Sequence, residues 1–251
     1  MESNPFWLTK PIAHSGGFYN NQTVFGCSLS AIAIAIEKKY PIEFDVYVLA
    51  DGGTVVFHHP LDLERLAGVR KDLLELKGEE LKQIHFNNSN DTICSLPEVL
   101  DFVAERVPLL VEVKFFHRKH RRDGCKIIAE VLQKYQGKYA VQSFDPRIVR
   151  WFKKNRPQVG CGLLVSSWKK DIYRPKNFLV RWITAKILLF KYCSPDFINI
   201  NYLDLPYPPL TKILAKRKLP VLAWTISNQV DYDRIKPQVD NIVFENFIPE
   251  K

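Results

Sequence analysis

The chain has 251 residues, a length that suits one large domain or two small ones and at which single α/β barrels occur. Hydrophobic residues make up 46% and charged residues 25%, which is ordinary for a soluble globular protein with a core. The formal net charge is +9, which favours anionic partners: phosphate esters, acidic membrane surfaces or nucleic acid.

Three further features argue against secretion and membrane insertion. The five cysteines are odd in number and form no metal-type Cys-x-x-Cys, so reduced thiols in a cytoplasmic setting are expected. Residues 1–17 have no charged head followed by an apolar stretch, so no signal peptide is expected. The most apolar later stretch, Trp182–Phe190, contains Lys186 and is too short to cross a bilayer.

Apolar runs of strand length alternate along the chain with segments of helical period. The predicted strands are Pro11–His14, Ile42–Val48, Leu109–Lys114, Ala140–Ser143, Cys161–Val165, Phe197–Asn201, Pro220–Thr225 and Asn241–Phe244. The predicted helices are Ser28–Lys39, Leu96–Arg106, Cys125–Tyr135, Pro146–Asn155, Phe178–Tyr192, Pro208–Lys218 and Gln229–Lys236. Eight strands alternating with helices predict a parallel sheet closed into a (β/α)8 TIM barrel.

Two segments need separate interpretation. Ser28–Lys39 alternates as a strand would, but its length, its alanines and a Ser at the expected N-cap favour a helix. Residues 59–95 are polar and mixed, and they interrupt the alternation soon after the second strand. We interpret them as a small insertion. No linker rich in Pro, Gly or Ser is present, so residues 1–251 are expected to form a single domain.

Two carboxylates lie inside the second predicted strand. Because side chains alternate along a strand, Glu43 and Asp45 point to the same side, which in a barrel is the interior. Burying unpaired charges costs roughly several kcal/mol each, unless a cation balances them. The third strand adds Glu112, which shares a face with Lys114. Three such carboxylates predict an oxygen-lined site for Mg²⁺ or Ca²⁺ rather than for zinc.

Two histidines frame the predicted cation site. His14 ends the first strand, and His58 ends the short apolar run that follows the second. Active sites of this fold lie at the carboxyl ends of the strands, so these groups are expected to converge there. Any one of them alone would more often be structural. Together, a divalent cation and two histidines able to exchange protons indicate cleavage of a phosphate ester.

These motifs resemble the glycerophosphodiester phosphodiesterases, a family of TIM barrels. The resemblance rests on an Ile-Ala-His-x-Gly start followed in order by I-E-x-D-V, V-V-x-H and L-x-E-x-K blocks, and later by the VQSFDP, PDFININ and LPVLAWTI segments. It implies a metal held by Glu43, Asp45 and Glu112. It also implies His14 and His58 as the acid–base pair, with Lys114 on the phosphate of a small phosphodiester substrate.

The chain departs from the family pattern in three places. Ser15 stands where the family usually has an arginine that touches the phosphate. Residues 25–28 read Phe-Gly-Cys-Ser in place of Pro-Glu-Asn-Ser/Thr, and His59 replaces an Asp that often follows the second histidine. The metal-binding and proton-transfer groups are retained while part of the substrate-binding set is not. An altered substrate, such as a sugar or lipid diester, is therefore expected more than an altered reaction.

Basic and aromatic residues at strand ends are further candidates for substrate binding. Residues 117–122 read His-Arg-Lys-His-Arg-Arg, and Arg118 and Arg121 in this predicted loop could replace the missing arginine. Residues 166–177, SSWKKDIYRPKN, form a second basic loop. Together they could gather an anionic substrate or contact an anionic lipid surface; alternatively, they are solvated loops that raise solubility. Phe144 and Trp224, at the ends of strands four and seven, are candidates for a pocket wall or for core packing.

Three rival functions remain compatible with these residues. The same groups could support transfer or cyclisation, with a substrate hydroxyl attacking in place of water, as in the related phospholipase D-like toxins. The barrel could instead bind a ligand without turnover. A nucleic-acid binder is suggested by the charge alone, and no helix-turn-helix, zinc-finger or stacking motif supports it, so no nucleic-acid partner is expected.

Overall fold

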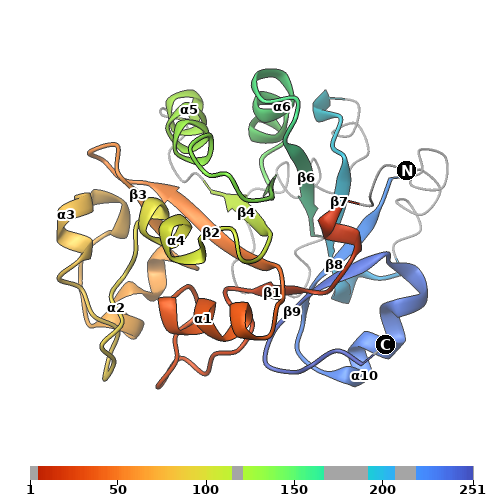
Figure 1. Cartoon of the computed structure of the whole chain (residues 1–251), viewed down its shortest axis with the longest axis horizontal. Helices are drawn as coiled ribbons and strands as arrows, with labels where there is room; N and C mark the ends of the chain where they lie inside the picture. Colours follow the sequence, from red (N-terminus) through yellow and green to blue (C-terminus); the bar gives the residue numbers. More distant parts are fainter. Residues whose placement is uncertain (1–4, 115–120, 167–191, 207–218, 251) are drawn as a thin grey trace.

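A computed structural model describes residues 5–114, 121–166, 192–206 and 219–250. Its strands are β1 (Ile12–His14), β2 (Ile42–Val48), β3 (Thr54–Val56), β4 (Leu109–Val113), β5 (Tyr139–Ser143), β6 (Gly160–Val165), β7 (Phe197–Asn201), β8 (Val221–Ile226) and β9 (Asn241–Phe244). All except β3 pair in parallel with their neighbours, and β1 pairs with both β2 and β9 (Figure 1). The eight parallel strands thus close on themselves, which confirms the TIM barrel.

The helices of the described residues lie between the barrel strands. They are α1 (Leu29–Glu37), α2 (Leu63–Ala67), α3 (Gly78–Leu81), α4 (Leu96–Val103), α5 (Arg121–Leu132), α6 (Pro146–Asn155) and α10 (Gln229–Ile235), with short 3₁₀ turns η1 (Phe6–Leu8), η2 (Pro60–Asp62), η3 (Leu73–Glu75), η5 (Tyr202–Asp204) and η6 (Lys236–Gln238). The predicted helix at 208–218 and all but the last residue of the one at 178–192 fall outside the described residues. No described helix is long and apolar enough to cross a membrane.

Local capping explains where the predicted helices begin. The Ser28 hydroxyl accepts a hydrogen bond from the backbone N–H of Ala31, so the alternating apolar run continues as a helix rather than as a strand. Ser95 and Glu98 form a reciprocal capping box at the start of α4, with Pro97 in its first turn. At the start of α6 the Asp145 carboxylate accepts a hydrogen bond from the backbone N–H of Arg147. These side chains satisfy backbone donors that a helix start would otherwise leave open.

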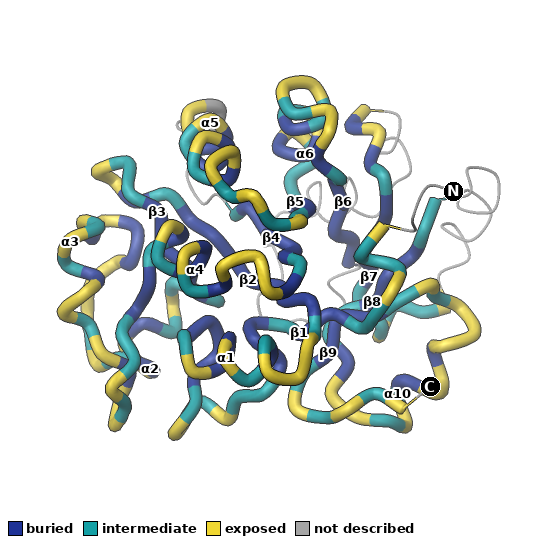
Figure 2. The backbone as a smooth tube through the Cα atoms, viewed as in Figure 1, coloured by how far each residue is buried: buried dark blue, intermediate teal, exposed yellow. Residues whose placement is uncertain are grey.

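The interior of the barrel has two layers of inward-facing side chains. An apolar layer lies toward the amino-terminal ends of the strands and consists of Ile12, Leu110, Ala140, Phe197, Leu222 and Val243. η1 covers it from below, because Gly160 leaves room for the Trp7 ring, which packs 5.2 Å from the ring of Phe197. Figure 2 shows the strands as mostly buried segments, with exposed stretches on the outer helices. We call this apolar layer the plug. The second layer, which is polar, lies above it toward the carboxyl ends of the strands.

The insertion lies beside the barrel, next to β2 (Figure 1). It begins with β3, which pairs antiparallel with β2, and residues 57–95 continue through α2 and α3. They surround a small hydrophobic core, which also includes Phe25, Tyr47 and Leu49. Phe86 of this core stacks on Phe25, with ring centroids 4.8 Å apart, and so joins the insertion to the loop after β1. The predicted insertion is confirmed, and its start at β3 carries the chain back toward the open end of the barrel.

Candidate active site

The three predicted metal ligands meet inside the barrel. Glu43, Asp45 and Glu112 are each at most 6% exposed, and they offer ligand oxygens that all lie within 4.8 Å of one another. The reason is register: in the parallel pair of β2 and β4, Asp45 is the partner of Glu112. Burial, together with the charge of Asp45, raises the pKa of Glu43 to about 7, and burial also raises the pKa of Glu112 well above its usual value.

This carboxylate cluster fits a hard divalent cation. Glu43 Oε2 and Asp45 Oδ2 are buried and have no hydrogen-bond partner among the described residues. Buried oxygens without partners are costly, and a bound cation would satisfy both of them. Three carboxylates with no thiolate or imidazole within the cluster are the donor set typical of Mg²⁺ or Ca²⁺. The residues present therefore fit the cation that the sequence predicts.

Lys114 supplies one positive charge to the cluster. Its Nζ lies 2.9 Å from Asp45 Oδ1 and 3.5 Å from Glu112 Oε1, and it donates to the carbonyl oxygen of His58 at 3.4 Å. Burial by itself would lower the pKa of Lys114, but the two carboxylates outweigh it and raise that pKa. One ammonium against three carboxylates leaves a negative excess when all are ionised, which leaves room for a cation's charge.

Two amides that sequence analysis missed support the cluster from inside the barrel. Gln142 on β5 donates through Nε2 to Glu43 Oε1 at 3.1 Å. Asn199 on β7 in turn donates through Nδ2 to Gln142 Oε1 at 2.9 Å. Both are buried and point inward, as their positions in the alternating AVQS and FININ runs would have indicated. Gln142 holds Glu43 directly, and Asn199 holds Gln142.

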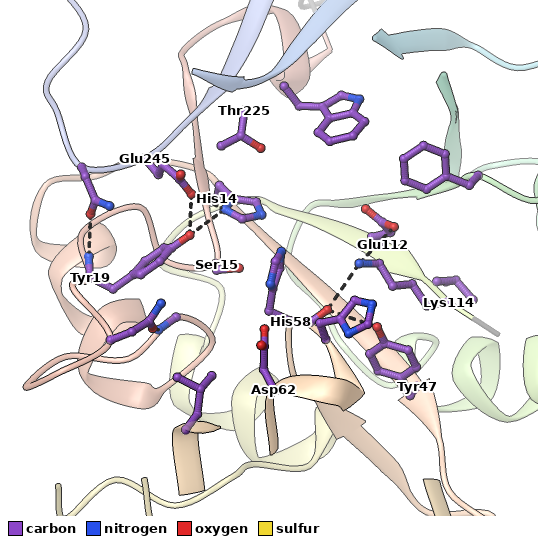
Figure 3. A pocket seen from close by; sticks show the side chains of 18 of the residues that line it. His14, Ser15, Tyr19, Tyr47, His58, Asp62, Glu112, Lys114, Thr225 and Glu245 are labelled. Atoms are coloured by element: carbon purple, nitrogen blue, oxygen red, sulfur yellow. Dashed lines mark hydrogen bonds and ion pairs between the residues drawn. The ribbon is translucent and has the colours of Figure 1, made fainter. Parts of the chain in front are cut away.

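His14 is held by two side chains that the sequence analysis also missed. Its Nδ1 lies 2.8 Å from Glu245 Oε2 and 2.9 Å from the hydroxyl of Tyr19, as Figure 3 shows. Burial tends to lower the pKa of His14, but the hydrogen bond and charge of Glu245, together with the charges of Glu43 and Asp45, raise it to about 9. Glu245 directly follows the last barrel strand, so its position at a strand's carboxyl end was the available signal.

His58 faces His14 across the same cavity. The two ring centroids are 5.1 Å apart and the rings are nearly perpendicular. In the part of the chain that the structure describes, the His58 ring forms no hydrogen bond, while its carbonyl accepts bonds from Tyr47 and Lys114. Burial lowers the pKa of His58 to about 4, against the attraction of Asp45. The structure therefore brings both predicted histidines together above the carboxylates.

The cavity around these groups has a volume of about 770 Å³. Phe144 and Trp224 form one wall, with ring centroids 5.5 Å apart, and Trp224 Nε1 donates to the carbonyl oxygen of Asn199. Asp62 and Arg65, which form an ion pair, line the side formed by the insertion. The predicted aromatic residues thus line the cavity, and the insertion contributes a polar edge that was not predicted.

Ser15 lies in a tight turn beneath the cavity. Its side chain is fully buried and its hydroxyl accepts a hydrogen bond from Cys27 Sγ at 3.4 Å. Its backbone N–H donates to the carbonyl oxygen of Glu43. Gly16 follows with φ at +95°, and a Cβ there would meet Ala31 at 2.7 Å, so only glycine fits this turn. The motif's backbone is thus retained, but the position that usually bears an arginine offers no charge.

The predicted basic loop is only partly described. Arg118 lies outside the described residues, as does most of the second basic loop at 166–177. Arg121 and Arg122 were predicted to lie in a loop, but they are the first two residues of α5. The prediction was wrong there because this helix starts before the apolar periodicity that was used to find it; Asp123 lies in its first turn, where a negative charge suits the helix dipole.

Comparison with known proteins identifies the family. A model described as the glycerophosphoryl diester phosphodiesterase family matches residues 14–247. The chain belongs to this family. Its members are phosphoric diester hydrolases, so the reaction class indicated by the sequence is confirmed at that level. No curated protein matched the sequence.

Solved structures of this family share the fold at low sequence identity. A phosphodiesterase from Oleispira antarctica, solved with the product sn-glycerol-3-phosphate, is 19% identical with a TM-score of 0.75, over 94% of this chain and 92% of that one. A glycerophosphodiester phosphodiesterase from Parabacteroides distasonis is 16% identical with a TM-score of 0.73, over 94% and 92%. One from Thermotoga maritima is 20% identical with a TM-score of 0.68, over 94% of each chain.

Proposed function

We propose that this enzyme hydrolyses a glycerophosphodiester, or a related sugar or lipid phosphodiester, with a divalent cation and two proton-transferring histidines. The observation that carries this proposal is the meeting of His14 and His58, 5.1 Å apart, over three buried carboxylates in one cavity. The family match and the sn-glycerol-3-phosphate bound to the Oleispira antarctica relative support the substrate class.

Each group has a part that its position supports. Glu43, Asp45 and Glu112 would hold Mg²⁺ or Ca²⁺, which when bound would neutralise charge on the phosphate oxygens. Of His14 and His58, one takes a proton from the attacking water and the other returns one to the departing alkoxide. Lys114 lies at the edge of the carboxylates and lines the cavity, where its ammonium can contact a phosphate oxygen.

The lining of the cavity supports a substrate larger than a bare diester. With Ser15 uncharged, the phosphate lacks one charge-assisted contact, worth about 1.5–3 kcal/mol. Trp224 and Phe144 offer an apolar wall on which a sugar or an acyl-bearing glycerol could pack. We therefore expect glycerophosphocholine to be a poorer substrate than diesters with a larger organic group.

The excess of positive charge suggests where the enzyme works. A net charge of +9 favours approach to anionic substrates and contact with an anionic lipid surface. None of the five cysteines, all of which are described, forms a disulfide, which suits a reducing, cytoplasmic setting. Binding to vesicles with and without anionic lipid, at low and high salt, tests the surface contact.

A screen of phosphodiesters tests the proposed reaction. Glycerophosphodiesters with choline, ethanolamine and inositol groups, together with lysophospholipids, are incubated with Mg²⁺ or Ca²⁺ and then with EDTA. Released alcohol is measured, and phosphorus NMR separates a phosphomonoester product from a cyclic phosphate. We expect a monoester that disappears in EDTA. Full turnover in EDTA would contradict the cation, and a cyclic product would show that an internal hydroxyl attacks in place of water.

A further inference from the structure

We propose that Glu245, held by Tyr19, is the positioning residue that makes Nε2 of His14 its proton-transferring nitrogen. The expected loss of turnover rests on the function proposed above. The hydrogen-bond geometry does not depend on that function, and it can be tested without measuring turnover. Neither side chain belongs to the motif blocks that contain the predicted catalytic and metal-binding residues. Tyr19 lies in the loop after β1, and Glu245 follows β9.

Barrel closure brings these two segments together. β1 and β9 are neighbours in the closed sheet, with Ala13 opposite Phe244. The loop after β1 is fastened to the segment after β9 by two further hydrogen bonds: Tyr19 N donates to Asn246 Oδ1 at 2.9 Å, and Asn246 N donates to the carbonyl oxygen of Gly17 at 2.6 Å. These bonds fix the segment that carries Glu245, and Figure 3 shows Glu245 beside His14 and Tyr19.

The hydrogen bonds leave one consistent placement for the ring proton. The Tyr19 hydroxyl has a single proton, and it donates this proton to Glu245 Oε2 at 2.5 Å. His14 Nδ1 then faces two acceptors, the carboxylate at 2.8 Å and the phenolic oxygen at 2.9 Å. A lone pair on Nδ1 would be repelled by both, so Nδ1 carries the hydrogen. In the neutral ring the lone pair is therefore on Nε2.

Nε2 is also the nitrogen that faces the carboxylates. It lies 4.0 Å from Glu43 Oε2, on the side of the ring away from Glu245. A proton taken from a substrate or water oxygen would add to this lone pair, while the Nδ1 proton stays in its bond to Glu245. The positive charge that forms on the ring is then balanced by the carboxylate across that bond. When Nε2 returns the proton, the transfer runs in reverse between the same atoms.

Other roles for Glu245 fit the geometry less well. It is not part of the described carboxylate cluster whose oxygens lie within 4.8 Å of one another, so it is not placed as a fourth ligand. The arrangement is also specific to one histidine, because no side chain among the described residues bonds the His58 ring. An orienting carboxylate behind one of two histidines gives that ring a fixed orientation and leaves the other ring free to turn toward the substrate.

Steady-state kinetics test the positioning role. Glu245→Gln keeps the size of the side chain but offers an N–H as well as an oxygen to Nδ1, so the wrong tautomer becomes accessible. We expect kcat on a glycerophosphodiester with an alkyl leaving group to fall roughly 100-fold or more, with KM changed less than about 3-fold; the analogous carboxylate-to-amide change in a serine protease triad costs about 10⁴-fold. Tyr19→Phe should cost about 3- to 10-fold, since the carboxylate remains.

Controls separate this role from a general loss of stability. Glu37→Gln makes the same substitution at an exposed position at the end of α1, and Tyr139→Phe removes a hydroxyl at the amino-terminal end of β5; both should keep wild-type kinetics. In a His14→Ala background, Glu245→Gln should cause no further loss, because it acts only through that ring. Multiplicative losses in the double variant would overturn the proposal. If Glu245→Gln does not fold, Tyr19→Phe takes its place in this cycle.

Nitrogen NMR of the ring tests the geometry independently of turnover. Of the six histidines, the His14 signals are those missing from His14→Ala. Above about pH 9, where the His14 ring of the wild type is neutral, we expect it to carry its proton on Nδ1, and Glu245→Gln to shift the ring toward the other tautomer. A wild-type ring protonated on Nε2 would overturn the proposal even in an active enzyme. A correct tautomer in a chain that cleaves no diester would instead reject the proposed function and leave this inference standing.

Discussion

The two layers inside the barrel come largely from the same strands, but the lower layer stabilises the fold and the upper layer holds the candidate active-site groups. Five apolar plug residues are each followed, two positions later on the same strand, by a residue of the upper layer: His14, Glu112, Gln142, Asn199 and Trp224. The sixth, Val243, is followed two positions later by Glu245, just beyond the end of β9. One step of two residues rises about 6.6 Å along a strand. Within that distance the interior changes from close-packed hydrocarbon to polar and charged groups, so on these strands stability and chemistry are separated along the strand.

The difference teaches how a fold can bury several ionisable groups. The upper layer is electrostatically strained, since burial raises the pKa values of Glu43 and Glu112, and two of its oxygens have no partner. The lower layer has no such cost, and its residues are almost fully buried. We infer that packing of the lower layer offsets the desolvation of the upper one. Changes to each layer should therefore affect different measurements, as the following experiments examine.

Glu43→Gln should show most clearly that activity and stability depend on different layers. We expect activity to fall by about 10³-fold or more, because one of the three proposed cation ligands is neutralised. In EDTA at pH 8, however, the variant should be more stable than wild type by up to about 1–2 kcal/mol, because the ionised Glu43 is disfavoured in the folded state. Urea unfolding and kinetics of the same preparations measure both. A variant that is inactive because it is less stable would contradict the separation.

The two histidines should each affect rate while the fold stays intact. His14→Ala and His58→Ala are expected to lower kcat by about 10²–10⁴-fold and to remain folded. Comparing an alkyl with a nitrophenyl leaving group sharpens the assignment. The variant that lacks the general acid should recover much of its rate on nitrophenol, which needs no proton to leave. Near-normal rates of both variants on the true substrate would make the histidines structural.

A change in the lower layer should have the reverse effect. Leu110→Ala removes a fully buried side chain two residues before Glu112 on β4 and should lower the free energy of unfolding by about 2–5 kcal/mol. At a temperature where the variant stays folded, kcat should remain within about 2-fold of wild type. A large fall in kcat with the fold intact would show that the plug also positions the carboxylates.

The response of stability to pH should depend on the cation. The pKa of Glu43 is raised in the folded state to about 7, so without cation its contribution to stability falls as pH rises from about 4.5 past 7. A cation needs the ionised form, so the gain in melting temperature on adding Mg²⁺ or Ca²⁺ should be small at pH 5 and grow up to pH 8. Glu43→Gln should flatten this dependence. A gain that is equal at pH 5 and pH 8 would contradict competition between proton and cation.

The smallest expected effect is at Ser15. Ser15→Arg restores the cation that the family usually has, and it should lower KM for glycerophosphocholine by about 10-fold, near the lower end of what one charge-assisted hydrogen bond contributes. Ser15→Gln is the matched control, with length but no charge. An unchanged KM with the enzyme still active would show that the phosphate does not approach this turn.

Much of this site could be predicted because its signals are local. Strand period placed Glu43 and Asp45 on one face, and adjacent motif blocks placed Glu112, His14 and His58 at carboxyl ends of strands. Capping residues such as Ser28 settled a run that its alternation alone would have made a strand. Each of these signals lies within a few residues of what it determines, so no knowledge of distant packing was needed.

What only the tertiary structure decided was which distant residues meet. His14 and Glu245 are 231 positions apart, and nothing near either residue indicates the other. Their contact follows from the closure of β9 onto β1. The bonds from Asn199 to Gln142 and from Gln142 to Glu43 follow from the register of strands around the barrel. The sequence by itself determined which side chains face inward. The closed sheet determined their partners, because hydrogen bonds need distances near 3 Å, which strand pairing sets and local periodicity does not.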